Sequence, residues 1–141
     1  MTLTKFLNNN ENSSLGNERL YDFSLIGLTT NRDNLYEIIN NRVDKMINNG
    51  LLEEIKSLKP YYLSSRVLNT GIGYKELYDY FDNKVTLEEA IDNIKRNSRK
   101  YAKRQYTFFN HQIPVVWFNT DYNNFNNTIT EVCSYINELI K

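Results

Sequence analysis

Tyr21-Asp-Phe-Ser-Leu-Ile-Gly-Leu28, followed by the polar run Thr29-Thr-Asn-Arg-Asp33, is the stretch of this 141-residue chain that decides its fold class. The apolar density and length of the first part predict a buried strand. The polar run offers several helix N-caps, so we expect a helix from about Asp33 to Asn49, ended by Gly50 at its C′ position. A strand that leads straight into a helix indicates an α/β arrangement.

Two shorter helical pieces are expected after Gly50. One covers residues 51–58 and stops before Pro60, and the other covers residues 74–81. The stretch between them, residues 60–70, has no clear periodicity and is expected to be irregular.

The last third of the chain repeats the alternation of helix and strand. The capping box Thr86-Leu-Glu-Glu89 opens a long helix that should reach about Phe109. The apolar run 114–118 predicts a second strand, and apolar residues at helical spacing from Ile129 to Ile140 predict a final helix. The order therefore predicts an α/β fold that is mostly helical with two short strands. Cys133 and Trp117 are expected in its core.

The net charge of zero hides one concentrated basic element. Seventeen basic residues balance seventeen acidic ones, which argues against a generic nucleic-acid or membrane-surface binder. Without the residues of this element, however, eleven basic residues face seventeen acidic ones. The element lies in the long helix and consists of Lys95, Arg96, Arg99, Lys100, Lys103 and Arg104.

The two faces of this helix separate at about 100° per residue. One arc carries Leu87, Ile91, Ile94, Ser98, Tyr101, Gln105 and Phe108, and the basic residues take the opposite half. Like charges on neighbouring turns repel, so an unmixed basic face favours a polyanion such as a phosphate or RNA backbone. An acidic partner surface and a plain solvated face remain open.

Arg42 falls in the middle of the apolar arc of the 33–49 helix. A charge buried there must be paired, because burying it alone costs several kcal/mol, on the order of a buried ion's desolvation penalty. The residue is therefore either part of a structural ion pair, a long stem reaching out to water, or an arginine aimed into a phosphate site.

Composition excludes several kinds of site. A single cysteine rules out an intramolecular disulfide and CxxC-type zinc binding, and a single histidine, His111, makes a transition-metal site unexpected. No apolar run approaches the length of a membrane span and no signal peptide is evident, so we expect no membrane partner and a cytoplasmic location. No GxxxxGK[ST] phosphate loop occurs in the sequence.

Four segments carry a resemblance to one known family by their order and spacing. They are 22–28, 32–46 with 50–54, 71–76, and 87–109 with Trp117. The strings Ile-Gly-Tyr-Lys-Glu and Tyr-Ala-Lys-Arg-Gln are specific in combination. From about residue 20 onward, the chain thus resembles the C-terminal part of bacterial tRNA dimethylallyltransferases, also called tRNA isopentenylpyrophosphate transferases.

The resemblance implies a P-loop kinase-like parallel-sheet core with a helical insertion. Residues 1–19 would be a linker at the end of that insertion, and residues 20–141 the C-terminal part of the core domain. Enzymes of this family use magnesium and transfer a dimethylallyl group from dimethylallyl diphosphate to N6 of the adenosine 3′ to the anticodon. The magnesium ligands are expected outside this chain.

The resemblance also implies roles for particular residues. Arg42 would contact the diphosphate, and residues 70–75 and 103–110 would contact the tRNA anticodon stem-loop. With the basic residues upstream, the expected tRNA-binding residues are Thr70, Gly71, Ile72, Gly73, Tyr74, Lys75, Arg96, Arg99, Lys100, Lys103, Arg104, Gln105, Tyr106, Thr107, Phe108, Phe109 and Asn110.

The family's phosphate loop and the aspartate that acts as base both precede the matching region. The chain is therefore expected to be an inactive C-terminal fragment that needs the N-terminal half as a partner. Unpaired strand edges and exposed apolar surface would favour self-association. Two alternatives remain: a non-catalytic RNA-binding module, and a fragment of a nucleotide-kinase-like enzyme.

Overall fold

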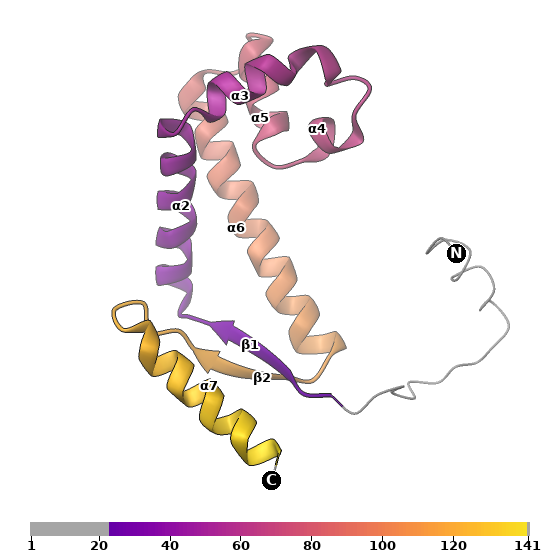
Figure 1. Cartoon of the computed structure of the whole chain (residues 1–141). Coiled ribbons are helices and arrows are strands. Elements are labelled where there is room, and N and C mark those ends of the chain that lie inside the picture. Colours follow the sequence, from indigo (N-terminus) through magenta and orange to yellow (C-terminus); the bar gives the residue numbers. More distant parts are fainter. Residues whose placement is uncertain (1–22, 141) are drawn as a thin grey trace, which may run out of the picture.

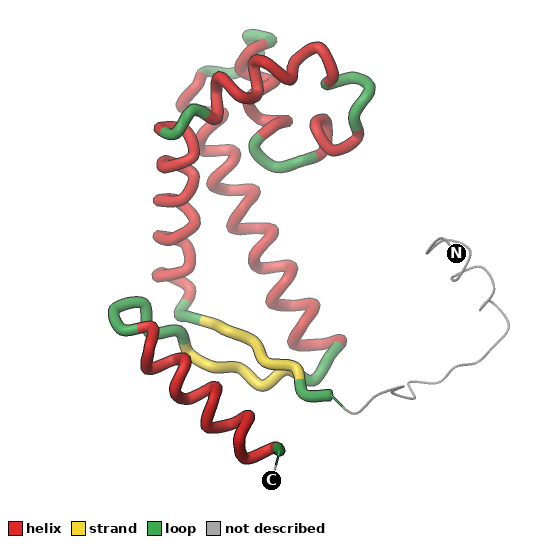
Figure 2. The backbone as a smooth tube through the Cα atoms, in the orientation of Figure 1, coloured by secondary structure: helices red, strands yellow, loops and turns green. Residues whose placement is uncertain are grey.

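A helical head is joined by two long helices to a small sheet in the computed structural model, which describes residues 23–140 (Figures 1 and 2). The expected linker, residues 1–19, lies outside the described residues. The elements follow in the order β1 (Leu25–Thr29), α2 (Arg32–Asn48), α3 (Leu51–Leu58), η1 (Lys59–Tyr61), α4 (Arg66–Thr70), α5 (Tyr74–Phe81), α6 (Leu87–Gln112), β2 (Val115–Asn119) and α7 (Phe125–Leu139).

The two strands form a parallel pair, with Leu25 opposite Val115 and Thr29 opposite Asn119. Parallel strands need a crossover connection, and here all the helices from α2 to α6 form the chain segment that connects β1 to β2. Gly27 lies opposite Trp117, and a Cβ on this glycine would come within 2.5 Å of the indole ring. The sheet therefore needs glycine at this position. A mostly helical chain with a short parallel sheet confirms the coarse fold expectation.

The long helices α2 and α6 begin at side-chain caps. The Asn31 side chain accepts a hydrogen bond from the Asn34 N–H at 2.8 Å. At the start of α6, the Thr86 hydroxyl accepts from the Glu89 N–H at 3.2 Å, and the Glu89 carboxylate accepts from the Thr86 N–H at 2.8 Å. The expected capping box is thus confirmed. The helix runs on to Gln112, beyond the expected end near Phe109.

The buried core lies in the head, where the ends of α2 and α6 that lie away from the sheet meet α3, α4 and α5 (Figure 1). Its buried members are Val43, Leu51, Ile55, Leu68, Leu77, Tyr78, Ala90 and Ile94. The expectation of an irregular stretch at 60–70 is wrong in part, because it contains η1 and α4. The Ser65 hydroxyl caps α4, and burial of Leu68 stabilises this short helix.

The sheet end of the molecule is much less covered than the head. Helix α7 lies along the sheet (Figure 1), and the Tyr135 ring lies 5.5 Å from that of Phe118. The side of α7 that carries Ile129 and Cys133 is exposed, and Trp117 is only half-buried. The expectation that Cys133 and Trp117 are core residues is therefore wrong, because no described element covers that side of α7 or completes the sheet.

None of the helices within residues 23–140 has the length and apolar character required to cross a membrane.

Candidate nucleic-acid interface

Five of the six basic residues of α6 form two neighbouring stripes with different surroundings, and the sixth, Lys103, lines a separate hollow with Arg32 and Tyr36. Lys95 and Arg99 point toward α2. The Lys95 ammonium pairs with Asp44 at 2.6 Å. The Arg99 guanidinium donates to the Asn40 side chain at 2.6 Å and lies 5.7 Å from the centre of the Tyr36 ring. These two residues therefore link α6 to α2.

The second stripe consists of Arg96, Lys100 and Arg104, and it lines a hollow of about 340 Å³. Residues of α6 from Asn93 to Arg104 form one side of this hollow, and residues between Thr70 and Asp79 form the other. We call it the cationic hollow. The structure thus brings together two sequence segments that were expected to contact tRNA.

Not every residue of the expected 70–75 segment lines the cationic hollow. Thr70, Ile72 and Lys75 do, whereas the two glycines and Tyr74 do not. The Tyr74 hydroxyl instead donates to the Glu54 carboxylate on α3 at 3.0 Å. This hydrogen bond, partial burial and the Glu54 charge together raise the pKa of Tyr74 above its usual value. The tyrosine therefore anchors the segment to the head.

The turn into α5 depends on Gly73 and Glu76. Gly73 has φ of 99° and ψ of −50°, a backbone conformation that residues with a Cβ rarely adopt. Its N–H donates to the Glu76 carboxylate at 2.8 Å, which is the half of a capping box that a glycine can complete. This turn places Ile72 and Lys75 on the rim of the cationic hollow.

Positive charge dominates the cationic hollow. Lys75, Arg96, Lys100 and Arg104 contribute four cations. Its two carboxylates are both engaged, because Glu76 accepts two hydrogen bonds and Asp79 pairs with Lys84 at 3.2 Å. Lys75 and Lys100 form no ion pair with any residue in 23–140. Unpaired ammonium groups beside an open hollow suit a phosphate backbone.

The C-terminal half of α6 makes a different surface. Gln105, Tyr106 and Phe109 line an apolar cavity of about 410 Å³ against the sheet. The Tyr106 ring lies 5.2 Å from that of Trp117, and the Trp117 indole N–H donates to Asn110 at 2.8 Å. The 103–110 segment is therefore divided: Arg104 belongs to the cationic hollow, and these other residues contact the sheet or the cavity beside it.

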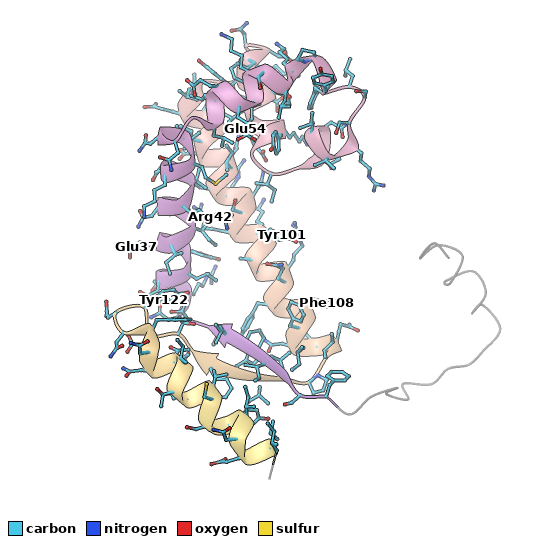
Figure 3. The ribbon with its side chains drawn as sticks, viewed as in Figure 1. Glu37, Arg42, Glu54, Tyr101, Phe108 and Tyr122 are labelled. Carbon is cyan, nitrogen blue, oxygen red and sulfur yellow. The ribbon has the colours of Figure 1, made fainter. Side chains whose placement is uncertain are left out.

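Tyr101 and Phe108 lie on the same side of α6 (Figure 3). They are 50% and 52% exposed, although the sequence assigned both to an apolar arc. Burial of that arc is limited to its N-terminal half, where α6 meets the head. Thr107 is also exposed, and its hydroxyl donates to the Lys103 carbonyl at 2.9 Å.

Arg42 is exposed on α2, on a different side of the helix from Glu37 (Figure 3). Its side chain has neither an ion pair nor a hydrogen bond with the rest of residues 23–140. The neighbouring Ile38 is 37% exposed. Within residues 23–140, the Arg42 guanidinium therefore has no ion-pair partner, and it is available for a ligand.

Residues 23–140 contain no group of three or more histidine, cysteine, aspartate or glutamate side chains that could hold a metal ion. His111, at the end of α6, is exposed.

Residues 1–112 match the model of the family described as IPP transferase. The chain belongs to the IPP transferase family.

Relatives in the IPP transferase family cover most of this chain. It is 52% identical over 118 residues to the tRNA dimethylallyltransferase of Geobacillus thermodenitrificans, which covers 83% of this chain and 38% of that protein. The corresponding enzyme of Anoxybacillus flavithermus is 51% identical over the same shares. The chain thus spans about 38% of the length of the curated relatives it matches.

Solved IPP transferase structures share the fold described above. The full-length tRNA isopentenylpyrophosphate transferase of Bacillus halodurans superposes with a TM-score of 0.77 at 47% identity, covering 86% of this chain and 40% of that one. The enzyme of Staphylococcus epidermidis superposes with a TM-score of 0.75 at 36% identity, covering 84% and 38%.

Proposed function

We propose that this chain is the C-terminal, tRNA-contacting part of a tRNA dimethylallyltransferase. The observation that carries the proposal is the cationic hollow, where Thr70, Ile72 and Lys75 meet Arg96, Lys100 and Arg104. The names of its relatives supply the substrate class. In this proposal, lysine and arginine side chains contact phosphates of the anticodon stem-loop and position it, without reading its sequence.

The proposed reaction forms a bond between N6 of an adenosine 3′ to the anticodon and the dimethylallyl carbon. The bond from that carbon to the diphosphate oxygen breaks, the diphosphate leaves, and N6 gives up a proton. Negative charge develops on the leaving diphosphate. Arg42 is proposed to stabilise that charge through its exposed guanidinium. Reaction at the base also requires the adenosine to leave its stack.

We further propose that residues 20–141 are the C-terminal part of a P-loop kinase-like core domain, and that residues 1–19 lead into it from a helical insertion. The chain spans only part of its relatives, and the phosphate-loop motif does not occur in its sequence. Phosphate cradling, base catalysis and any magnesium binding are therefore assigned to the remainder of the enzyme. The chain as given is expected to bind RNA without transferring the prenyl group.

Binding of a labelled anticodon stem-loop to the whole chain tests the tRNA assignment. We expect affinity that falls linearly with the logarithm of salt concentration and survives competition by an unrelated RNA hairpin. Binding that the unrelated hairpin removes would favour a general RNA-binding module. Loss of all RNA binding would favour a nucleotide-kinase-like enzyme and contradict the proposal.

The Arg42 assignment is tested in a chimera in which this chain replaces the aligned part of the Bacillus halodurans enzyme. Arg42→Ala should lower kcat at least about 100-fold, as removal of a charge-stabilising group does, while tRNA affinity is retained. Lys45→Ala is the matched control, because Lys45 is exposed on the same helix. Equal rates for the unmutated and Arg42→Ala chimeras would remove the assignment.

A further inference from the structure

Glu76 is a buried carboxylate that joins both sides of the cationic hollow. Its side chain belongs to α5 and the residue is 7% exposed. One carboxylate oxygen accepts from the Gly73 N–H at 2.8 Å. The other accepts from the side-chain amide of Asn97, on α6, at 2.7 Å. Glu76 thus links the turn at Gly73 to α6 through its two carboxylate oxygens.

We propose that Glu76 and Asn97 form a positioning pair that sets the spacing of the phosphate-binding cations. Lys75 precedes Glu76, and Asn97 lies between Arg96 and Lys100 on α6. A hydrogen bond between residues 76 and 97 therefore holds Lys75 at a defined distance from Arg96 and Lys100. The inference rests on the proposed function, because those cations are proposed there to contact tRNA phosphates.

As they are oriented, the two N–H donors around Glu76 require a side chain at this position that can accept a hydrogen bond at each of two atoms. Both partners of Glu76 are N–H donors, and an ionised carboxylate can accept from both. Glutamine has nearly the same size, but it accepts at one end and donates at the other. The Asn97 amide can turn to present its oxygen to a glutamine NH₂ group, so Glu76→Gln alone does not break the pair. In Asn97→Asp, by contrast, the new carboxylate faces the Glu76 carboxylate with no donor between them, which is unfavourable in a buried site.

The same argument identifies a rescuing variant. In the double variant Glu76→Gln/Asn97→Asp, the glutamine oxygen accepts from the Gly73 N–H and its NH₂ group donates to the new aspartate. Both hydrogen bonds are restored, the one between residues 76 and 97 with its direction reversed, and the net charge is that of the unmutated chain. A positioning role predicts rescue. A role of Glu76 that depends on its charge at position 76 does not.

The experiment measures stem-loop affinity of the whole chain as a function of salt, at a temperature where circular dichroism shows each variant to be folded. Asn97→Asp should weaken binding roughly three- to tenfold, the range seen for residues that act without touching the ligand. The salt dependence should also decrease by about one phosphate contact, a change of about 0.7 to 0.9 in log–log slope. Asn41→Asp is the matched control, because it adds the same charge at an exposed site on α2.

The possible outcomes separate the two proposals. Weaker binding by Asn97→Asp, a smaller salt slope and restoration of both by the double variant support the positioning pair. Unchanged affinity and slope in folded Asn97→Asp, or a double variant that folds and stays as weak as the single one, would overturn it while leaving the proposed function intact. If Asn97→Asp does not fold, the double variant alone decides, by matching or failing to match the unmutated slope. An unmutated chain that binds no stem-loop overturns the proposed function, and the inference with it.

Discussion

Lys95 and Lys100 show how two similar residues on one helix acquire different roles. Both belong to the basic element of α6, and their side chains differ in what they meet. Lys95 pairs with Asp44 on α2 and its side chain is 20% exposed. Lys100 lines the cationic hollow and forms no ion pair within residues 23–140. Only the second lysine has a charge left to neutralise a phosphate.

Alanine substitutions at these two positions should therefore have different effects. Lys100→Ala should weaken stem-loop binding and reduce the log–log salt slope by about 0.7 to 0.9, because one phosphate contact is lost. Lys95→Ala should leave the slope unchanged and lower the free energy of unfolding by about 0.2 to 1 kcal/mol, as loss of a partly exposed ion pair does. Salt titrations and urea denaturation measure the two effects. Equal slopes for the two variants would contradict the division of α6 into two stripes.

At the scale of the element, the carboxylate of Asp121 accepts hydrogen bonds from the turn that precedes α7 and from the start of α7 itself. Asp121 accepts from the backbone N–H groups of Asn123 and Asn124 at 3.0 and 2.9 Å, and from the Asn127 side chain at 2.9 Å. The hydrogen bond from the Asn124 N–H, then that of Asn127, are the main causes that lower the pKa of Asp121 below its usual value. The ionised form thus stabilises the start of α7.

The sign of this shift predicts how α7 responds to acid. Because the pKa of Asp121 is lower in the folded than in the unfolded chain, its ionised form stabilises the fold. This stabilisation is fully present above the pKa of the unfolded chain, about 3.9 for aspartate, and is lost as the pH falls through the pKa of the folded chain. Helical circular dichroism should therefore decrease in that acidic range, by less in Asp121→Asn than in the unmutated chain. Asp92→Asn, at an exposed position on α6, is the control. Identical acid profiles for the unmutated chain and Asp121→Asn would contradict this role.

Across the whole molecule, burial is concentrated at one end. The hydrophobic core lies in the head, whereas the sheet and α7 leave large apolar side chains exposed, including Phe125, Ile129 and Leu139 at 49%, 47% and 53%. Contiguous exposed apolar surface favours association. The sheet end thus presents exposed apolar side chains on which another protein surface can pack.

We accordingly expect the chain to self-associate through its sheet end. Sedimentation velocity should show association that increases with protein concentration. Ile129→Glu should reduce it, because a carboxylate on the exposed side of α7 is unfavourable to bury. Thr130→Glu adds the same charge at the next exposed position and should have a smaller effect. A monodisperse monomer across the concentration range would show that this surface does not associate.

Much of the local structure follows from the sequence alone, because its causes are local. The capping box at Thr86, the stop at Gly50 and the strand propensity of residues 25–29 and 115–119 depend on neighbours along the chain. The segments expected to bind tRNA were identified from their motifs. That Thr70, Ile72 and Lys75 share a hollow with α6 was not predictable from periodicity, since residues of α5 separate them from α6 in the sequence.

Tertiary packing decided which residues are buried and which charges are free. Helical periodicity placed Cys133 in a core and Arg42 in an apolar arc, but an arc is buried only where another element covers it, and both residues are exposed. The same periodicity could not separate Lys95 from Lys100, because only the position of α2 determines which stripe is paired. No pattern in the sequence pairs Glu76 with Asn97, since a carboxylate and an amide become a pair only when two helices bring them within hydrogen-bonding distance.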